Sequence, residues 1–377
     1  MKRIFEDYDL ALQKFRNEGR LRSIPDVLNT SEMFNLSSND YLGLAQNMEL
    51  RRLFIKELSE DGFPPFSSSS ARLLIGNFAA HEELEETLCR LYGRASLLFN
   101  SGYHANIGII PALADKQTLI LADKWVHASI IDGIRLSEAR TIRYRHGDYQ
   151  QLTQLLHKHV ASYKRVIIIT ESVFSMDGDE ADLWTLVALK NQFQNVILYV
   201  DEAHAVGVRG KKGLGCAEEK ECMQEIDVLI GTFGKALASV GAFVICDELI
   251  KRYIVNSARS FIFSTSLPPI NALWSNFIMK RLEAFIDERK HLQQIGREFR
   301  KQLADNGVKT SSTSHIVPFI VGESEKATHL SEELRQNGFY VLPIRPPTVP
   351  QGTARLRFSF TANMPLDAID RLITLLL

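Results

Sequence analysis

The feature of this chain that most restricts its fold is a series of short apolar runs between Leu84 and Cys246. The runs are rich in valine, isoleucine and leucine, and amphipathic stretches separate them. They cover residues 96–99, 118–122, 165–170, 195–200, 227–231 and 241–246. Because each run is apolar throughout instead of alternating with polar residues, it is typical of a strand that is covered on both faces. We therefore expect a mostly parallel sheet with helices on both sides.

The chain length and a change of character near residue 271 predict two packed units. A chain of 377 residues is long enough for one large and one smaller domain. Four stretches follow residue 271: a charged helical stretch to 301, an apolar run at 316–321, a helical stretch at 327–337 and an extended run at 354–360. We expect an α/β fold with a large domain at 61–270. A small α+β domain at 271–377 would be completed by the N-terminal segment 1–60.

Composition argues against several classes of protein. The 44 basic residues nearly balance the 45 acidic ones, so no nucleic acid partner is expected. Acidic residues near the N-terminus stand where a signal peptide needs its apolar stretch, and no apolar run approaches the length of a membrane span. The four cysteines form no Cys-x-x-Cys pair and have no histidines at zinc-ligand spacing, so no metal site is expected. These features favour a cytoplasmic protein without membrane contact.

Polar residues that follow the apolar runs point to a cofactor. In parallel sheets ligands gather at the carboxyl ends of the strands, and Asp201 directly follows one such run, with Lys235 coming 34 residues later (235 − 201). A pyridoxal ring requires a carboxylate beside its nitrogen, an amine for its aldehyde, and hydroxyl and N–H groups for its phosphate. Asp201, Lys235 and the pair Ser175 and Thr232 match these needs in kind.

Two histidines extend this pattern, although each residue also has an ordinary structural explanation. His204, in the Asp-Glu-Ala-His run that begins at Asp201, could donate to the phenolic oxygen of the ring, and His127 could stack on its other face. Taken alone, Lys235 would be a solvated surface lysine, Asp201 a helix N-cap and either histidine a structural residue. The combination and its order favour the cofactor.

The Asp-Glu-Ala-His run also resembles the Walker B motif of some NTPases, which requires a Walker A loop. The Gly-Lys at Lys235 is followed by Ala236 where a magnesium-binding Ser or Thr should stand. It also has Leu229 where the loop needs a glycine, and it comes after the acidic motif. A Gly-x-Ser-x-Gly nucleophile elbow is also absent from the sequence. An NTPase and a serine hydrolase are therefore disfavoured.

Six segments in a fixed order resemble the α-oxoamine synthases, a fold-type I pyridoxal-phosphate family, and the likeness covers nearly the whole chain. They are NLSSNDYLG (35–43), LFNSGYHAN (98–106), DKWVHAS (123–129), ESVFSMDGD (171–179), DEAHAVG (201–207) and TFGK (232–235). The resemblance implies a mostly parallel sheet of the seven-stranded type, pyridoxal 5'-phosphate as cofactor, and a homodimer with Ser264 or Thr265 reaching the phosphate bound by a partner.

Carried over residue by residue, the resemblance implies a set of cofactor contacts. Lys235 would form the Schiff base, Asp201 would pair with the pyridinium nitrogen, and His127 would stack on the ring and orient the substrate. The other implied cofactor-binding residues are Gly102, Tyr103, Ser175, His204 and Thr232. Lys235, His127 and Asp201 are the implied catalytic residues.

The resemblance also implies substrate contacts. Arg357 would grip the carboxylate of an amino acid, with Arg22, Asn39 and Thr348 contributing beside His127. Without the resemblance, Arg357 would be a surface arginine on an edge strand.

The stretch 345–357 is most similar to the family members that condense L-alanine with a pimeloyl thioester, carried on coenzyme A or acyl carrier protein. Two alternatives remain: a sister synthase that uses glycine or serine, and a non-catalytic partner subunit.

The sequence departs from the family pattern at the serines 67–70, which stand where a glycine-rich element is usual. Serine has less access than glycine to positive φ, so the sequence leaves the conformation of this loop open. The stretch after Lys235 is also poorer in glycine than is usual.

Overall fold

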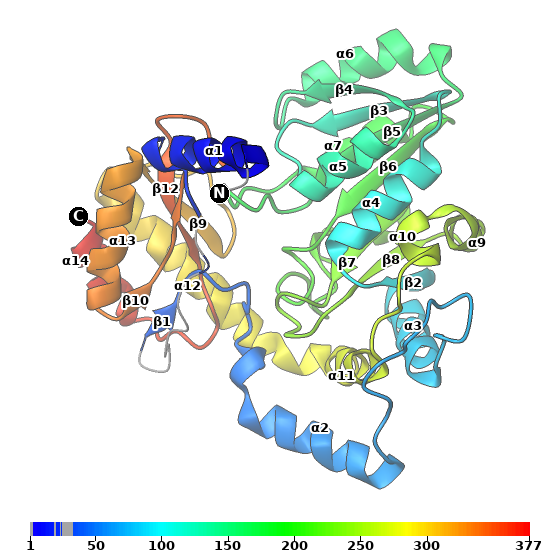
Figure 1. Cartoon of the computed structure of the whole chain (residues 1–377), viewed down its shortest axis with the longest axis horizontal. Helices are drawn as coiled ribbons and strands as arrows, with labels where there is room; N and C mark the ends of the chain where they lie inside the picture. The colour runs from blue at the N-terminus through cyan, green and yellow to red at the C-terminus, as the bar shows by residue number, and fades with distance from the viewer. Residues whose placement is uncertain (1–2, 19, 23, 25–32) are drawn as a thin grey trace. The chain divides into compact units, whose positions relative to one another are not determined.

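The computed structural model describes residues 3–18, 20–22, 24 and 33–377 (Figure 1). The chain divides into two compact units. Unit 1 comprises Met1–Ser38, Met176–Gly178 and Gln293–Leu377, and unit 2 comprises Asn39–Ser175 and Asp179–Leu292. The domain limits after residues 60 and 270 stay predictions, since these units divide the chain at other positions.

Unit 2 is built on a seven-stranded sheet with the strand order β2-β8-β7-β6-β5-β3-β4. The strands are β2 (Ala95–Phe99), β3 (Thr118–Asp123), β4 (Arg140–Tyr144), β5 (Arg165–Glu171), β6 (Val196–Asp201), β7 (Val228–Thr232) and β8 (Ala242–Cys246). Strand β8 runs antiparallel to both of its neighbours, and the other adjacent pairs are parallel. The predicted α/β fold with a mostly parallel sheet is confirmed.

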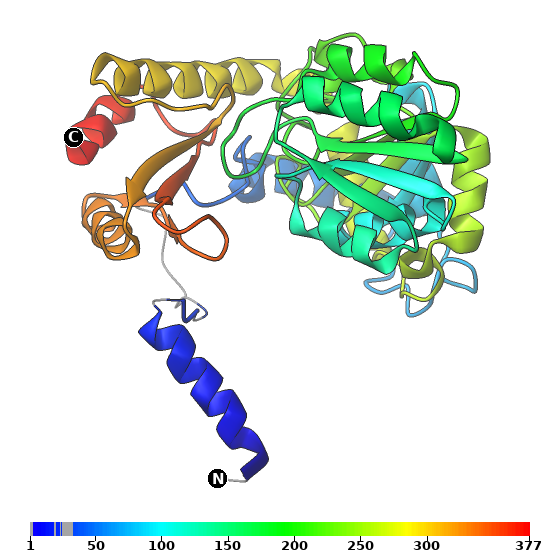
Figure 2. The same ribbon diagram turned by 90° about the horizontal axis from the view of Figure 1, so that it is seen from above.

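Helices cover both faces of this sheet (Figure 2). On one face α4 packs against β7, β8, α5 and α10, and elsewhere α3 packs on β2 and α7 on β6. The helices of unit 2 are α2 (Met48–Asp61), α3 (Ala79–Tyr92), α4 (Gly102–Leu113), α5 (Ala128–Leu136), α6 (Tyr149–His159), α7 (Leu183–Lys190), α8 (Cys216–Glu219), α9 (Glu248–Ser257), α10 (Arg259–Ile262) and α11 (Pro269–Met279). Neighbours such as Leu97 and Leu98 point to opposite faces and are both buried, which is why the strand sequences lack alternation.

Strand β4 was not among the predicted runs. It lies at the edge of the sheet, and its sequence Arg-Thr-Ile-Arg-Tyr is only partly buried, with Arg140 and Arg143 exposed and Tyr144 buried. An edge strand needs no continuous apolar run, because solvent reaches one side of it.

Unit 1 contains a three-stranded antiparallel sheet with the order β11-β12-β9 and a parallel pair of short strands, β1 and β10. These strands are β1 (Phe34–Asn35), β9 (Ile316–Gly322), β10 (Phe339–Tyr340), β11 (Pro343–Ile344) and β12 (Ala354–Ser359). Its helices include α1 (Glu6–Asn17), α13 (Ser324–Gln336) and α14 (Ala368–Leu376). Segments from both ends of the chain therefore form one α+β unit.

The charged helical stretch expected from about 271 to 301 is not one helix. Helix α11 ends at Met279, a 3-10 turn spans Leu282–Phe285, and α12 spans Ile286–Asp305. Over the described ranges, no helix is long and apolar enough to cross a membrane. No group of three or more histidine, cysteine, aspartate or glutamate side chains in the described part of the chain is arranged to hold a metal ion.

Candidate active site

Five parallel strands of unit 2 deliver polar residues to one edge of the sheet. β2 leads into α4, β3 into His127, β5 into Ser175, β6 into His204 and β7 into Lys235. Because parallel strands end at the same edge, residues far apart in the sequence meet there.

A hydrogen-bonded chain holds the amine of Lys235. Its Nζ lies 2.9 Å from His204 Nε2, and His204 Nδ1 lies 2.7 Å from the hydroxyl of Tyr41. Tyr41 in turn donates to Asn39 Oδ1 at 2.9 Å. Since the single hydroxyl proton of Tyr41 goes to Asn39, His204 must donate from Nδ1 and accept at Nε2 from Lys235. The predicted residues Asn39, His204 and Lys235 therefore lie together.

Asn106 of α4 is the centre of a second buried network. Its Nδ2 donates to Asp201 Oδ2 and to Ser129 Oγ, each at 2.9 Å, while its Oδ1 accepts from the hydroxyl of Tyr199 at 2.6 Å. Ser129 Oγ lies 2.7 Å from His127 Nδ1. Both amide hydrogens and the carbonyl of Asn106 are thus used, which fixes the orientation of Asp201 and connects it to His127.

His127 caps the N-terminus of α5, where its Nδ1 accepts from the backbone N–H of Ser129 at 3.2 Å. Partial removal of the ring from water lowers its pKa, and the charge of Lys235 lowers it further, against the opposing effect of Asp201. A neutral ring that accepts at Nδ1 carries its proton on Nε2.

Two carboxyl groups lie side by side at the ends of β5 and β6, where Glu171 is in register with Asp201. Glu171 is only 2% exposed, and no described residue bonds its Oε1. Burial raises the pKa of Glu171 well above its ordinary value, and the charge of Asp201 raises it further. Both effects favour the protonated form of Glu171. Glu202, by contrast, accepts from the backbone of Cys216 and Ala217, each at 2.8 Å, and has a structural role.

Thr232 and Ser175 lie in turns at the same edge. Thr232 Oγ1 donates to the carbonyl of Gly241 at 3.0 Å and accepts from Gly234 N at 3.2 Å, which shapes the turn that precedes Lys235. Ser175 is half-buried in the turn after β5.

The N-terminus of α4 carries the other two predicted cofactor residues, Gly102 and Tyr103. Ser101 caps this helix by accepting from His104 N, so the preceding N–H groups have no partner within the helix. A helix N-terminus of this kind favours anions. Tyr103, which is 45% exposed, donates to Asp132 Oδ2 at 2.7 Å.

The remaining predicted substrate residues belong to unit 1. Arg22 donates to Thr348 Oγ1 at 3.0 Å, so these two residues lie together. Arg357 is on the central strand β12 and is 8% exposed, which excludes the alternative of a surface arginine on an edge strand. It donates to Ser359 Oγ at 2.5 Å, while Arg355 on the same face pairs with Asp177 at 2.7 Å.

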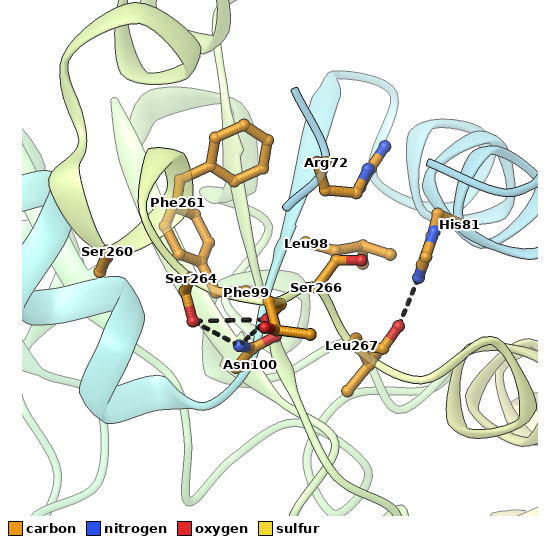
Figure 3. A pocket seen from close by; sticks show the side chains of 11 residues that line it. Arg72, His81, Leu98, Phe99, Asn100, Ser260, Phe261, Ser264, Ser266 and Leu267 are labelled. Carbon is orange, nitrogen blue, oxygen red and sulfur yellow. Dashed lines mark hydrogen bonds between the residues drawn. The ribbon is translucent and has the colours of Figure 1, made fainter. Parts of the chain in front are cut away.

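Figure 3 shows a separate pocket in unit 2, between α3 and the segment that follows α10. Asn100 donates to Ser264 Oγ at 2.9 Å and to the carbonyl of Thr265 at 2.6 Å, and His81 bonds the carbonyl of Leu267. The pocket therefore fixes the segment that carries Ser264 and Thr265, the residues expected to serve a partner subunit.

The serine-rich loop packs against the same segment. Ser68 donates to the carbonyl of Ser266, and Ser266 donates to that of Gly76, both at 2.7 Å. Ser69 has a φ of 50°, in the left-handed region. The loop thus keeps a conformation suited to glycine and holds it with side-chain hydrogen bonds.

Comparisons with known proteins agree with this geometry. The family model Aminotransferase class I and II matches residues 31–376. A relative from Pasteurella multocida that is named for 8-amino-7-oxononanoate synthase is 50% identical over 379 residues, which cover 98% of each chain. The chain belongs to the 8-amino-7-oxononanoate synthase family.

Solved structures of this family and its neighbours share the fold. The 8-amino-7-oxononanoate synthase of Francisella tularensis is 29% identical with a TM-score of 0.77, covering 91% of this chain and 96% of that one. The serine palmitoyltransferase of S. paucimobilis, with bound pyridoxal phosphate and myriocin, is 28% identical with a TM-score of 0.87, covering 99% and 96%. The predicted α-oxoamine synthase family, enzyme class and pyridoxal-phosphate cofactor are confirmed.

The donor set of this family member fits the cofactor. Each reactive part of the cofactor has a matching group at the same edge of the sheet. The ring nitrogen is matched by the carboxylate of Asp201, the aldehyde by the amine of Lys235, and the phosphate by the N-terminus of α4. A side chain at Gly102 would meet no other atom within 4 Å, so there is open space in front of that terminus.

Sequence reasoning gave no role to several residues of the two networks. Tyr41, Asn106 and Ser129 fall within the family segments, and their position there was the available signal. The sequence does not mark Tyr199 as a site residue, because it stands within the apolar run of a buried strand.

Proposed function

We propose that the chain condenses L-alanine with a pimeloyl thioester to give 8-amino-7-oxononanoate, carbon dioxide and the free thiol. One observation carries the chemistry: Lys235 Nζ is held by His204 at the sheet edge where Asn106 orients Asp201. The identity of the substrates is supported by the 50% identical relative named as this synthase. The expected cytoplasmic location stays a prediction.

Pyridoxal phosphate, when bound, supplies an aldehyde that bonds to amines and a ring that accepts electron density from the substrate Cα. Lys235 would hold the aldehyde, and Asp201 would keep a proton on the ring nitrogen. His204, Ser175 and Thr232 would contribute hydrogen bonds, and the N–H groups at Gly102 and Tyr103 would face the phosphate.

Lys235 is also the base that we propose for the Cα proton of alanine. Its Nζ is tethered at the site, and its neighbour His204 Nε2 is an acceptor, so His204 favours the Nζ orientation in which a lone pair faces the substrate. The raised pKa of Glu171 favours its protonated form, so Asp201 is the carboxylate that we propose for the ring nitrogen. His127 would lie over the ring and orient the substrate.

Arg357 is proposed to hold the alanine carboxylate, the group that later leaves as carbon dioxide. A guanidinium can bond both carboxylate oxygens, whereas a lysine ammonium offers only a point charge. Arg22, Asn39 and Thr348 would complete the substrate contacts.

An Arg357→Lys variant is expected to raise KM for L-alanine by about tenfold to a hundredfold, because one of two charge-assisted hydrogen bonds is lost. Steady-state kinetics of thiol release, at saturating acyl donor, measure this change. Arg335→Lys, at an exposed position on α13, is the matched control and should leave KM unchanged. An unchanged KM in Arg357→Lys would exclude a bidentate role for Arg357.

A comparison of amino acids decides between the proposed synthase and its sister enzymes. We expect thiol release with pimeloyl-CoA or pimeloyl acyl carrier protein to be fastest with L-alanine, compared with glycine and L-serine at equal concentration. A preference for glycine or serine would replace the alanine assignment by that of a sister synthase. A purified protein without visible absorbance from bound cofactor would instead favour the non-catalytic subunit.

The proposed homodimer is supported by apolar side chains that unit 2 leaves exposed. Leu74, Ile75 and Phe263 are 79%, 81% and 71% exposed. In the sequence they lie within three residues of Arg72 or Ser264, which line the pocket of Figure 3. A second copy of the chain would cover such a surface.

A further inference from the structure

A histidine that the proposed mechanism does not use lies between two carboxylates at the edge of the sheet. His146 follows β4, and its Nδ1 lies 2.9 Å from Asp123 Oδ1 at the end of β3. Its Nε2 lies 2.7 Å from Asp179 Oδ2, which follows β5. Asp123 is 2% exposed, and the side chain of His146 is 16% exposed.

The two contacts favour a ring that carries a proton on each nitrogen. An ionised carboxylate can only accept a hydrogen bond, and a neutral imidazole has only one N–H to donate. Both contacts are hydrogen bonds to carboxylates only when each ring nitrogen of His146 carries a proton. The pKa of His146 is raised from its ordinary value of 6.5 to about 9, because its bonds to Asp123 and Asp179 outweigh the opposing effect of burial.

Aromatic contacts hold the ring in place. The indole of Trp125 stacks on His146 with centroids 3.8 Å apart and planes at 15°, and the edge of Phe174 approaches to 4.4 Å. A cationic ring over an indole gains electrostatic attraction from the π-system. Trp125 and Phe174 come from the same two segments as Asp123 and Asp179.

These segments carry two of the proposed cofactor contacts. Asp123 and Trp125 precede His127 by four and two residues (127 − 123, 127 − 125), and Asp123 Oδ1 also accepts from Trp125 N at 2.8 Å. On the other side, Phe174 N donates to the carbonyl of Asp179 at 3.0 Å, which closes the turn that contains Ser175.

We propose that His146 is a positioning residue that, as a doubly protonated imidazolium, ties the segment carrying His127 to the segment carrying Ser175. This proposal rests on the proposed function, since His127 and Ser175 are significant only if they contact the cofactor. The residue does not touch the reacting atoms.

The charged surroundings make the ring sensitive to alkaline pH. Asp123 also interacts with Tyr144 at the end of β4, Tyr149 on α6 and Glu171 at the end of β5. Arg145 and Asp148 lie on the same turn as His146. Burial raises the pKa of Tyr149 to about 12, so this phenol keeps its proton near pH 9. Arg145 and Asp148 pair with each other at 2.6 Å.

The sign of the effect follows from the direction of the shift. Because folding raises the pKa of His146, its contribution to the free energy of unfolding is fully present below 6.5 and is lost as pH rises through about 9. The cofactor affinity should weaken over the same interval.

The first experiment uses the cofactor-free full chain labelled with ¹⁵N-histidine. We expect one histidine to carry protons on both nitrogens at about pH 7.5 and to titrate with a midpoint near 9. Its signal should vanish in His146→Gln, and in Asp179→Asn its midpoint should fall, because one carboxylate is removed. A His146 signal with a single protonated nitrogen at that pH would overturn the proposal, whatever the outcome for the proposed function.

The second experiment measures the dissociation constant of pyridoxal phosphate, by its absorbance, from about pH 7 to about pH 10. At neutral pH we expect His146→Gln to raise this constant about tenfold, the equivalent of one lost buried hydrogen bond to a charge. The wild-type constant should rise through pH 9 more steeply than that of His146→Gln, which shares any effect of Lys235. His329→Gln, at an exposed site on α13, should match the wild type.

The outcomes separate the two proposals. If His146→Gln and Asp179→Asn both had the wild-type affinity for pyridoxal phosphate and the wild-type pH profile, the positioning role would be overturned. Failure of the wild type itself to bind pyridoxal phosphate would overturn the proposed function, while the histidine titration would still report on His146. Asp179→Asn supplies the test if His146→Gln does not fold.

Discussion

Replacement of Lys235 by alanine is expected to lower the rate of thiol release by at least about a thousandfold, because a tethered acid–base group contributes roughly 10²–10⁴-fold and the attachment point of the cofactor is lost as well. Removal of the amine also leaves His204 Nε2 without the donor that it has at 2.9 Å. The measurement is thiol release from the pimeloyl thioester with saturating L-alanine.

The control for this variant is Lys326→Ala, since Lys326 is a 68% exposed lysine on α13. It should retain the wild-type rate. Lys235→Ala should fold, because Lys235 is not part of the buried apolar core. Circular dichroism of the variant checks this. Condensation at the normal rate in folded Lys235→Ala would refute the proposed role of the lysine.

Asp201→Asn is expected to lower the same rate by at least about a hundredfold, the usual loss when one preorganised electrostatic contact to developing charge is removed. An amide cannot balance a protonated ring nitrogen, although it has nearly the same shape as the carboxylate. The carbonyl of the new amide can keep the hydrogen bond from Asn106, whereas its NH2 group cannot accept from Ala203 N as Asp201 Oδ1 does at 2.9 Å. Circular dichroism of the variant checks that the fold is kept.

The chain offers a matched control for this second substitution. Asp247 is the N-cap of α9, where its side chain accepts from Leu249 N, and asparagine caps helices about as well as aspartate. Asp247→Asn should therefore leave both stability and rate unchanged. If Asp201→Asn were as active as Asp247→Asn, the ring nitrogen would have no need of the Asp201 charge.

The sheet of unit 2 was predictable because burial on both faces leaves a mark in the sequence. Val166 to Ile169 are all buried in β5, and such a run has few alternatives to a covered strand. Strand β4 was not predictable in the same way, since its position at the edge is a property of the whole sheet. The two-residue strands β1 and β10 pair residues about 300 positions apart, and a local pattern carries no information about such a partner.

Some residues of the candidate site were likewise predictable from the sequence, and others were not. Lys235, Asp201 and His127 have chemistry that a reader can match to the needs of a cofactor, and their order can be matched to a family. The amide of Asn106 and the hydroxyl of Tyr199 have no such chemistry of their own. Their importance comes from three hydrogen bonds made across α4, α5 and β6, which only the folded structure brings together.

The loop at Ser69 shows a further limit of sequence reasoning. The loss of glycine left the backbone conformation open, and the structure keeps a positive φ at this serine. Non-glycine residues in this region cost of order 1–3 kcal/mol and persist where surrounding contacts fix them. Here the contacts of Ser68 and Ser266 serve that purpose.

The division of the chain between the two units also sets the order in which they can form during synthesis. Unit 2 ends at Leu292, so all of its strands are present before the last part of the chain leaves the ribosome. Unit 1 must wait, because β1 at Phe34 pairs with β10 at Phe339 and its central strand β12 begins only at Ala354. Strand β1 therefore remains without β10 while unit 2 folds. A chain truncated in its last 40 or so residues would leave an intact α/β unit attached to an unfinished one.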